Sequence, residues 1–362
     1  MGDSAPVQAA AAPIDITIAA SPSLAPLLAQ LRTSLLVSTY EAGALVVVRA
    51  LGGSLFIDMV RVDRAMGVAA IRNRLALGTR HRILEMSNMP VLSAQMPTAA
   101  GQPAPDACYV PLNTHVTGEI DLHEIAWGED ELWFVNTRFS CLCTRSALES
   151  FQPRWRPPFV KRLRPDDRCH LNGIAMDGGR PAYVTLFAAT DEPEGWRAQR
   201  TTGGLVLDVA SGEAVAHGLS MPHSPRLYRG ELWVEESGRG TLARVDRAAG
   251  RCDTVAAFDG FTRGLDFVGG VAFVGLSKVR ESRSFGGVPI TERVDVDRRF
   301  CGVQAVDLAT GRSLGFLQFE TGVGEIFAVQ ALQGVVHPAF VEDADPLVGA
   351  SYVLSPETLA QM

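Results

Sequence analysis

The stretch HEIAWGEDELWFV (residues 123–135) decides the fold, because it recurs as HSPRLYRGELWVE (223–235). The two segments align without a gap, so that His123 falls on His223 and the triplet ELW occupies the same place in both. Each segment reads as a strand, a tight turn and a second strand. A strand pair that recurs in this way is typical of a protein built from β-sheet repeats.

Four further segments fit the same template. They are MGVAAIRNRLALG (66–78), NGIAMDGGRPAYV (172–184, with a one-residue insertion), RGLDFVGGVAFVG (263–275) and, more loosely, GEIFAVQALQGVV (324–336). The six copies follow one another at intervals of roughly 40 to 60 residues, which is the spacing of four-stranded propeller blades. The sequence therefore predicts an all-β, six-bladed β-propeller, with seven blades as the alternative.

The two ends of the chain are expected to close the ring. Three strand-like runs, SLLVSTY, ALVVVRA and SLFIDMV, lie between residues 34 and 60 and precede the first copy. We expect them to pair with the C-terminal runs EIFAVQAL (325–332) and GVVHPAF (334–340), because pairing removes exposed sheet edges. Residues 1–25, rich in Ala and Pro, are expected to be irregular, and residues 26–362 to form a single propeller domain.

Three long polar segments separate predicted strands. They cover residues 96–118, 189–204 and 278–299. Long loops in a compact fold are often lids or binding loops, so we expect them to flank a functional site.

Composition excludes several classes of partner. The net charge of −7, without a basic run, argues against a nucleic-acid partner. No stretch reaches the ~18 apolar residues of a membrane span, and the first 20 residues lack the basic and apolar regions of a signal peptide. The six scattered cysteines read as reduced thiols, so a cytoplasmic location is predicted. GRGTLA (238–243) has the G-x-G-x-x-A pattern of a dinucleotide-binding loop. Because it lies between strands of one copy and not between a strand and a long helix, no nucleotide cofactor is expected.

Polar residues recur where the first strand of each copy begins. The aligned positions are Met66, His123, Asn172, His223, Arg263 and Gly324 or Glu325. The first strand of a propeller blade lies beside the central channel, so these side chains are expected to converge on the axis near one end. His170 stands two residues before Asn172 and is expected on the same side of its strand.

This column of residues predicts a functional site. Neutral imidazoles that converge with a carboxylate are typical of zinc, iron or manganese sites, more than of calcium sites. The predicted metal ligands are His123, His170, Asn172, His223 and Glu325. The alternative is structural: a propeller channel is wet, and polar side chains there can simply hydrogen-bond to water.

Further residues beside the column are candidates for catalysis and substrate binding. We predict catalytic roles for His123, His223 and Glu124, although strict strand alternation would turn Glu124 into the blade packing. Arg226, Arg263 and Asp266 are the predicted substrate-binding residues, since a guanidinium binds a carboxylate or phosphate through two parallel hydrogen bonds.

The third copy, HLNGIAMDGGRPAYVT (170–185), resembles a blade of the six-bladed propellers of the gluconolactonase and strictosidine-synthase type. That resemblance implies a divalent cation held by channel residues that match Asn172 and, more loosely, Glu325 and Asp266. His123 and His223 depart from that pattern. With LLVSTYEAGALVVVR near its start and CHLNGIAM in its middle, the chain more closely resembles a bacterial family of predicted propellers, known only as a domain of unknown function, over residues 30–345.

Two functions follow as hypotheses. The first is an enzyme with its active site on the propeller axis, a metal-assisted hydrolase or lyase that acts on a small polar molecule or peptide. The alternative is a non-catalytic propeller that binds a peptide or protein partner, because a fold alone does not fix a function.

Overall fold

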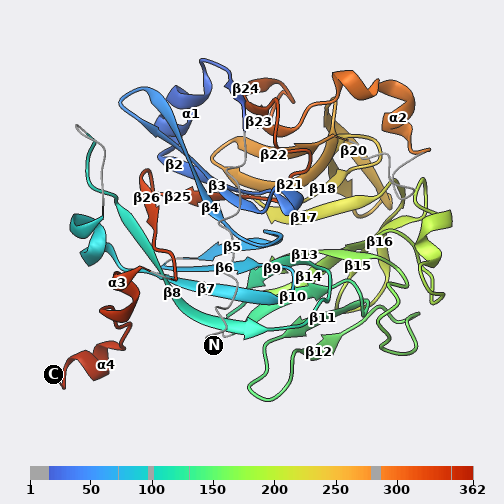
Figure 1. Ribbon diagram of the computed structural model, residues 1–362. Helices are drawn as coiled ribbons and strands as arrows, with labels where there is room; N and C mark the ends of the chain where they lie inside the picture. Colours follow the sequence, from blue (N-terminus) through green and yellow to red (C-terminus); the bar gives the residue numbers. More distant parts are fainter. Residues whose placement is uncertain are drawn as a thin grey trace, which may run out of the picture.

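The protein is a six-bladed β-propeller (Figure 1). The computed structural model describes residues 16–71, 73–96, 102–129, 131–278, 287–343 and 345–361. These residues form six β-sheets around one axis, which confirms the predicted fold and the predicted number of blades. We number the sheets as blades 1 to 6 in chain order.

Blades 2 to 5 are each built from four consecutive strands. Blade 2 contains β5 (Val68–Ile71), β6 (Arg74–Gly78), β7 (Arg82–Asn88) and β8 (Ala107–Val116). Blade 3 contains β9 (Leu122–Trp127), β10 (Leu132–Asn136), β11 (Cys141–Thr144) and β12 (Gln152–Trp155). Blade 4 contains β13 (Leu171–Asp177), β14 (Arg180–Leu186), β15 (Gly204–Asp208) and β16 (Ala214–Leu219). Blade 5 contains β17 (Pro222–Tyr228), β18 (Glu231–Glu236), β19 (Thr241–Asp246) and β20 (Arg251–Ala257).

Blades 1 and 6 combine strands from the two ends of the chain. Blade 1 contains β2 (Thr33–Ser38), β3 (Ala44–Leu51), β4 (Ser54–Arg61) and, at the axis, β25 (Ala328–Gln333). Blade 6 contains β21 (Phe261–Val268), β22 (Val271–Ser277), β23 (Gly302–Asp307), β24 (Ser313–Phe319) and an outer strand β1 (Ile18–Ala20). β25 pairs antiparallel with β2 along its whole length, as the predicted ring closure requires.

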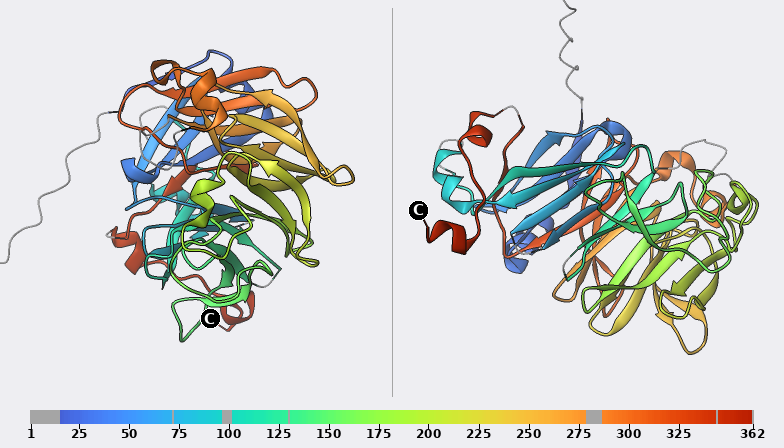
Figure 2. Two further views of the ribbon diagram at one scale, coloured as in Figure 1. Left: turned by 90° about the vertical axis from the view of Figure 1, so that its right-hand side faces the viewer. Right: turned by 90° about the horizontal axis from the view of Figure 1, so that it is seen from below.

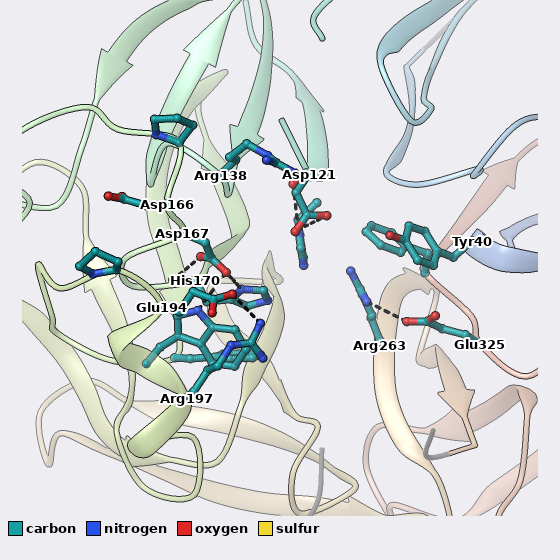
Figure 3. Close-up of a pocket in the computed structure, with 16 residues that line it drawn as sticks. Tyr40, Asp121, Arg138, Asp166, Asp167, His170, Glu194, Arg197, Arg263 and Glu325 are labelled. Atoms are coloured by element: carbon teal, nitrogen blue, oxygen red, sulfur yellow. Dashed lines mark hydrogen bonds and ion pairs between the residues drawn. The ribbon is translucent and has the colours of Figure 1, made fainter. Parts of the chain in front are cut away.

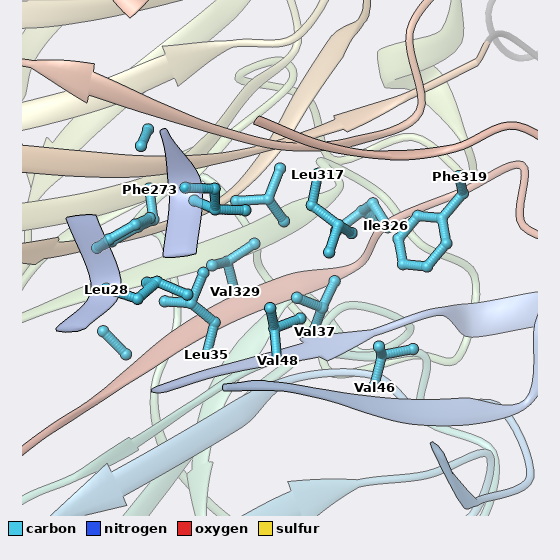
Figure 4. Close-up of a cluster of buried hydrophobic side chains, with 14 of the residues drawn as sticks. Leu28, Leu35, Val37, Val46, Val48, Phe273, Leu317, Phe319, Ile326 and Val329 are labelled. Carbon is cyan, nitrogen blue, oxygen red and sulfur yellow. The ribbon is translucent and has the colours of Figure 1, made fainter. Parts of the chain in front are cut away.

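The innermost strands form a closed circle, since β5, β9, β13, β17, β21 and β25 contact one another in that order and β25 contacts β5. Every residue of β2 is buried, because this strand has neighbours on both edges and both faces. Hydrophobic clusters fill the spaces between adjacent blades. The cluster between blades 6 and 1 includes Val37, Val48, Phe273 and Leu317 (Figure 4).

The helices are short and lie outside the sheets. The α-helices are α1 (Leu24–Leu31), α2 (Pro289–Arg293), α3 (Pro346–Gly349) and α4 (Pro356–Leu359). The 3₁₀ helices are η1 (Tyr40–Ala42), η2 (Pro90–Gln95), η3 (Gly195–Ala198) and η4 (Val296–Arg298). Helices α3 and α4 lie at the outer edge of the propeller, beside blade 2 (Figures 1 and 2).

The structure corrects three expectations about segments. Within residues 1–25, which were expected to be irregular, Ile18–Ala20 is strand β1, and Leu24 begins helix α1, which buries one side through Leu24, Ala25 and Leu28; residues 1–15 lie outside the described part. The segment 96–118 is no loop over its second half, because β8 occupies Ala107–Val116. The run GVVHPAF does not join the closing blade. Its Pro338–Phe340 (β26) pairs parallel with β8 at the edge of blade 2.

The six cysteines are all described and are free thiols. Cys141 and Cys143 lie two apart on β11, and both are buried. Within the described ranges, no helix combines the length and apolar character needed to cross a membrane.

The inner strands of blades 3 to 6 share an irregularity that positions the site. In blade 3, His123 and Glu124 together face one residue, Val135, in the pairing of β9 with β10. Equivalent register shifts occur at the start of β13, β17 and β21. A β-bulge of this kind breaks the alternation of side chains, so consecutive residues both turn toward the channel.

Candidate functional site

A cavity of about 570 Å³ lies at the end of the channel where the inner strands begin (Figure 3). Its lining comes from blades 1, 3, 4 and 6 and includes Tyr40, Asp121, His123, His170, Trp196, Arg263, Glu325 and Phe327. The predicted convergence of polar residues at this end of the axis is therefore seen for His123, His170, Arg263 and Glu325. Asn172, His223, Glu124, Arg226 and Asp266 are not part of the lining.

On one side of the cavity, Asp167 and His170 form a hydrogen-bonded pair (Figure 3). Asp167 Oδ2 lies 2.7 Å from His170 Nδ1 and also accepts a hydrogen bond from Trp196 Nε1 at 2.9 Å. The His170 backbone N–H donates to Asp167 Oδ1. Burial by itself raises the pKa of Asp167, but the nearby His170 outweighs it and holds the pKa below its ordinary value. The carboxylate therefore accepts a hydrogen bond from Nδ1–H, so the neutral form of His170 has its lone pair on Nε2.

His123 is held in the same tautomer by a threonine. Thr137 donates its hydroxyl proton to the Leu171 carbonyl at 2.6 Å, so its oxygen can only accept from His123 Nδ1, 2.8 Å away. The Asp121 carbonyl accepts from the same Nδ1 at 3.0 Å. Burial lowers the pKa of His123 to about 3. The imidazole is therefore neutral at physiological pH, with its lone pair on Nε2.

His223 repeats this arrangement in blade 5. Its Nδ1 lies 2.7 Å from Ser237 Oγ and 3.1 Å from the Met221 carbonyl, while Ser237 donates to the Thr262 carbonyl. Burial lowers the pKa of His223 well below its ordinary value. Its ring lies nearly parallel to that of His123, with centroids 6.2 Å apart.

The hydroxyl that orients each histidine also ties neighbouring blades together. Thr137 and Ser237 each stand just beyond the second strand of their blade and donate to the first strand of the next. Ser38 and Ser277 make the same bond, to the carbonyls of Met66 and Ile326. We call these four bonds the hydroxyl clips.

The clips also fix the register of four copies. The residues that follow the four accepting carbonyls are Gly67, Asn172, Arg263 and Phe327. The alignment therefore placed the first copy one residue too early, on Met66, and the last copy is aligned on Phe327. The loosely aligned Gly324 and Glu325 are therefore two to three residues too early. Phe327 stacks on Tyr40 with ring centroids 5.3 Å apart, and the two rings form one wall of the cavity.

Arg263 places a largely buried positive charge in the cavity. Its guanidinium lies over the ring of Phe327, with Cζ 3.4 Å from the centroid, and Nη1 is 3.3 Å from Glu325 Oε1. Its Nη2 is buried and has no hydrogen-bond partner among the described residues. Burial lowers the pKa of Arg263, while Glu325 and Asp121 act in the opposite direction.

Glu124 and Arg226 form a separate layer deeper in the channel. They make a close ion pair between blades 3 and 5, and Glu124 also accepts from the Ile174 backbone N–H of blade 4 at 2.8 Å. The bulge at residues 123–124 turns Glu124 into the channel, which corrects the expectation of strict alternation. Arg226 lines a second hollow, of about 260 Å³, among later residues of the inner strands.

Asp266 belongs to the same deeper layer. It accepts from the Gln330 side chain and from the Ala331 backbone N–H, and so links blade 6 to blade 1. Burial raises the pKa of Asp266, and also that of Glu124 despite its pairing with Arg226. Three predicted site residues, Glu124, Arg226 and Asp266, are thus engaged with one another or with the backbone, away from the axial cavity.

The five predicted metal ligands do not all converge: the rings of His123 and His170 lie 4.9 Å apart, but the other predicted ligands are engaged elsewhere. Asn172 Oδ1 accepts from the Thr185 hydroxyl at 2.8 Å and its Nδ2 donates to the His170 carbonyl at 3.0 Å, so both ends of the amide are used within blade 4. Glu325 faces Arg263. Across the described ranges, no three His, Cys, Asp or Glu side chains gather in an arrangement that could hold a metal ion. The predicted metal stays a prediction.

Several cavity residues were missed in the sequence. Asp167 and Trp196 come from connecting segments rather than from the aligned strand starts, and Tyr40 precedes the first copy. A signal was present for Trp196, because it lies in the predicted loop 189–204, which does form part of the cavity wall. Of the predicted loop 278–299, residues 279–286 lie outside the described part.

Comparisons with known proteins agree with the fold. The family description "Domain of unknown function (DUF4915)" matches residues 22–341. The chain is similar to a structure from a nidogen/laminin complex, with a TM-score of 0.53 and 11% identity over 84% of this chain and 99% of that one. It is also similar to a protein of unknown function from Bacteroides caccae, with a TM-score of 0.50 and 11% identity over 83% and 98%. None of the curated proteins compared with the chain matches it. The resemblance of the third copy to gluconolactonase blades stays a prediction.

Proposed function

Because the chain belongs to the family described as a domain of unknown function (DUF4915), which names no reaction, we propose a function from the site itself. The protein is an enzyme whose active site is the axial cavity, and it acts as a hydrolase or lyase on a small polar molecule. The observation that carries this proposal is the Asp167–His170 pair, which directs a lone pair on His170 Nε2.

His170 acts as the general base. A carboxylate that accepts the Nδ1 proton fixes the tautomer and stabilises the imidazolium that forms when Nε2 takes a proton. Asp167 is itself oriented by Trp196, so the pair is rigid before substrate arrives. In hydrolysis the proton comes from water as its oxygen attacks the substrate; in a lyase reaction it comes from a carbon next to the leaving group. In both cases His170 can return the proton to the departing group.

The rest of the lining fits general acid–base catalysis without a covalent enzyme intermediate. None of the residues that line the described cavity is Ser, Thr, Cys or Lys, so the usual side chains for covalent acyl or imine chemistry do not face it. Arg263 Nη2 supplies a hydrogen-bond donor with positive charge for a substrate oxygen. The predicted metal takes no part in this proposal, since no three metal-ligating side chains gather among the described residues.

The test compares His170 with a histidine outside the cavity. Purified protein is incubated with a mixture of polar metabolites, and consumption is followed by mass spectrometry. We expect His170→Asn to reduce the rate about 10²- to 10⁴-fold, whereas His217→Asn, at an exposed position on β16 of the same blade, leaves it unchanged. Equal rates for wild type and His170→Asn contradict the proposal. Absence of any consumption favours the non-catalytic alternative.

A second measurement needs no substrate. Asp167→Asn replaces an acceptor with an amide whose N–H₂ can donate to Nδ1, so the His170 proton is expected to move to Nε2. Long-range proton–nitrogen NMR spectra report which ring nitrogen carries the proton. The same variant is expected to lose turnover together with the Nε2 lone pair.

A further inference from the structure

The axial cavity holds a buried guanidinium, that of Arg263, which is only partly paired among the described residues. Arg263 Nη2 is buried without a hydrogen-bond acceptor among the described residues, although Nη1 of the same guanidinium is paired with Glu325. A buried charged donor left without an acceptor is costly, so a site of this kind is completed by a ligand oxygen. The first group that the cavity can bind is therefore an anionic oxygen.

A carboxylate lies close to this guanidinium. Asp121 lines the cavity with its side chain 36% exposed, and its charge opposes the lowering of the Arg263 pKa by burial, as expected for a nearby opposite charge. Its Oδ1 is 3.9 Å from His123 Nδ1, but this contact is no ion pair because the imidazole is neutral. Figure 3 shows Asp121 and Arg263 reaching the same part of the cavity from different blades. The second group that the cavity can bind is therefore a cation.

The charges of the lining decide between kinds of anion. The lining contains five carboxylates and three arginines, listed as Asp121, Asp166, Asp167, Glu194, Glu325, Arg138, Arg197 and Arg263. A dianion such as a phosphate monoester would face this excess of negative charge. A ligand with one carboxylate and one ammonium adds no net charge and satisfies both Arg263 and Asp121.

We propose that the ligand of the axial cavity is a small zwitterion of the α-amino acid type, free or at the end of a short peptide. Its carboxylate binds Arg263 Nη2 and its ammonium binds Asp121. This inference deepens the proposed function and rests on it for identifying the cavity as the active site.

Two further features of the cavity fit such a ligand. The neutral His123 keeps a lone pair on Nε2, which can accept a hydrogen bond from an ammonium, whereas an imidazolium would repel it. The walls contain the rings of Tyr40, Phe187, Trp196 and Phe327, so an apolar or aromatic side chain of the ligand can be buried there.

The experiment measures equilibrium binding rather than turnover. The probes are the twenty common L-amino acids and alanyl-alanine, tested by calorimetry. For the tightest binder, the matched amine (without the carboxylate) and the matched carboxylic acid (without the ammonium) are tested in turn. We expect the zwitterion to bind about tenfold or more tightly than either analogue. The ligand series does not depend on the folding of any variant.

Two variants assign the groups to residues. Asp121→Asn is expected to abolish the advantage of the zwitterion over the carboxylic acid, and Arg263→Gln its advantage over the amine. The exposed changes Asp177→Asn and Arg180→Gln, at the turn between β13 and β14, are matched controls that leave binding unchanged.

The outcomes separate the two proposals. The zwitterion proposal is overturned if no probe binds, or if an analogue that lacks one charge binds as tightly as the parent amino acid. His170→Asn is expected to bind the zwitterion normally while failing to turn it over. Normal turnover by that variant, with zwitterion binding intact, refutes the catalytic role of His170 and leaves the ligand class standing.

Discussion

The hydroxyl clip at Thr137 leads to a prediction about stability that can be tested without a substrate. Thr137 is fully buried, donates to the Leu171 carbonyl of the next blade, and accepts from His123 Nδ1. The change Thr137→Val keeps the size and branching of the side chain but removes both hydrogen bonds. Thr144, on β11 of the same blade, offers a matched control, because its buried hydroxyl has no hydrogen-bond partner within the described ranges.

The two changes are expected to affect the free energy of unfolding differently. Leaving a buried donor or acceptor unsatisfied costs about 1–3 kcal/mol, so Thr137→Val is expected to lower the free energy of unfolding by that amount. Thr144→Val removes a hydroxyl that is already unsatisfied, and it is expected to leave the free energy of unfolding unchanged or to raise it. The entropy of unfolding of a 362-residue chain is about 0.8 kcal/mol/K. The loss at Thr137 therefore corresponds to a decrease in Tm of about 1–4 °C.

The assay is thermal and urea unfolding of the two variants beside the wild type at pH 7, followed by circular dichroism. Far-ultraviolet spectra check that each variant keeps its β-sheet content. Equal shifts of Tm in the same direction for both variants would refute the reasoning, because they would show that the hydroxyl of Thr137 contributes no more than one without a partner.

Three further predictions concern buried charges. Burial raises the pKa of Glu235 to about 8, above its unfolded value, so the stability gained by its protonation is present at low pH and is lost as pH rises toward 8. Glu235→Gln is expected to stabilise the protein more at pH 8 than at pH 5. The difference in free energy of unfolding between variant and wild type should grow by about 1.4 kcal/mol per pH unit between these values. Urea unfolding at a series of pH values that shows no such trend contradicts the prediction. The lowered pKa values of His123 and His223 stabilise the folded protein above pH 6.5, and this stabilisation is lost as pH falls toward 3. Changing both residues to Gln is therefore expected to make the free energy of unfolding fall less steeply between these pH values. Glu124→Gln or Arg226→Met alone is expected to cost about 3–5 kcal/mol in urea unfolding, and the double variant to recover most of it; additive losses would disprove the pairing.

The sequence predicted the fold because the repeat is a property of many residues at once. The hairpins at 123–135 and 223–235 share apolar spacing, turn and aromatic positions. The structure places them at the axis, in blades 3 and 5. The last copy was harder, because it supplies only one strand, β25, and the partner strand β2 comes from the other end of the chain. Without a second strand, the alignment had nothing to fix its register.

The candidate site was predicted only in part, for two physical reasons. Alternation assigns neighbouring residues to opposite faces, but the bulge at His123 and Glu124 places both in the channel at different depths. Asp167, which orients His170, stands in the irregular segment before β13. The alternation of side chains along a strand does not apply there, so the sequence does not predict where its side chain lies. Contacts between an irregular segment and a strand depend on the path of the chain, and a single sequence does not reveal that path.

The closing blade has a consequence for synthesis. The bond from the Ala328 backbone N–H to Ser38 Oγ joins residues 290 positions apart in the chain. At 5–20 residues per second, a ribosome needs roughly 15–60 s to make the intervening segment. During that interval β2 and β3, with their runs of Leu and Val, lack the axial strand that completes their sheet. The nascent chain thus presents an apolar strand edge for nearly its whole time of synthesis, and its yield in the cell depends on how well that edge is shielded until the last blade closes.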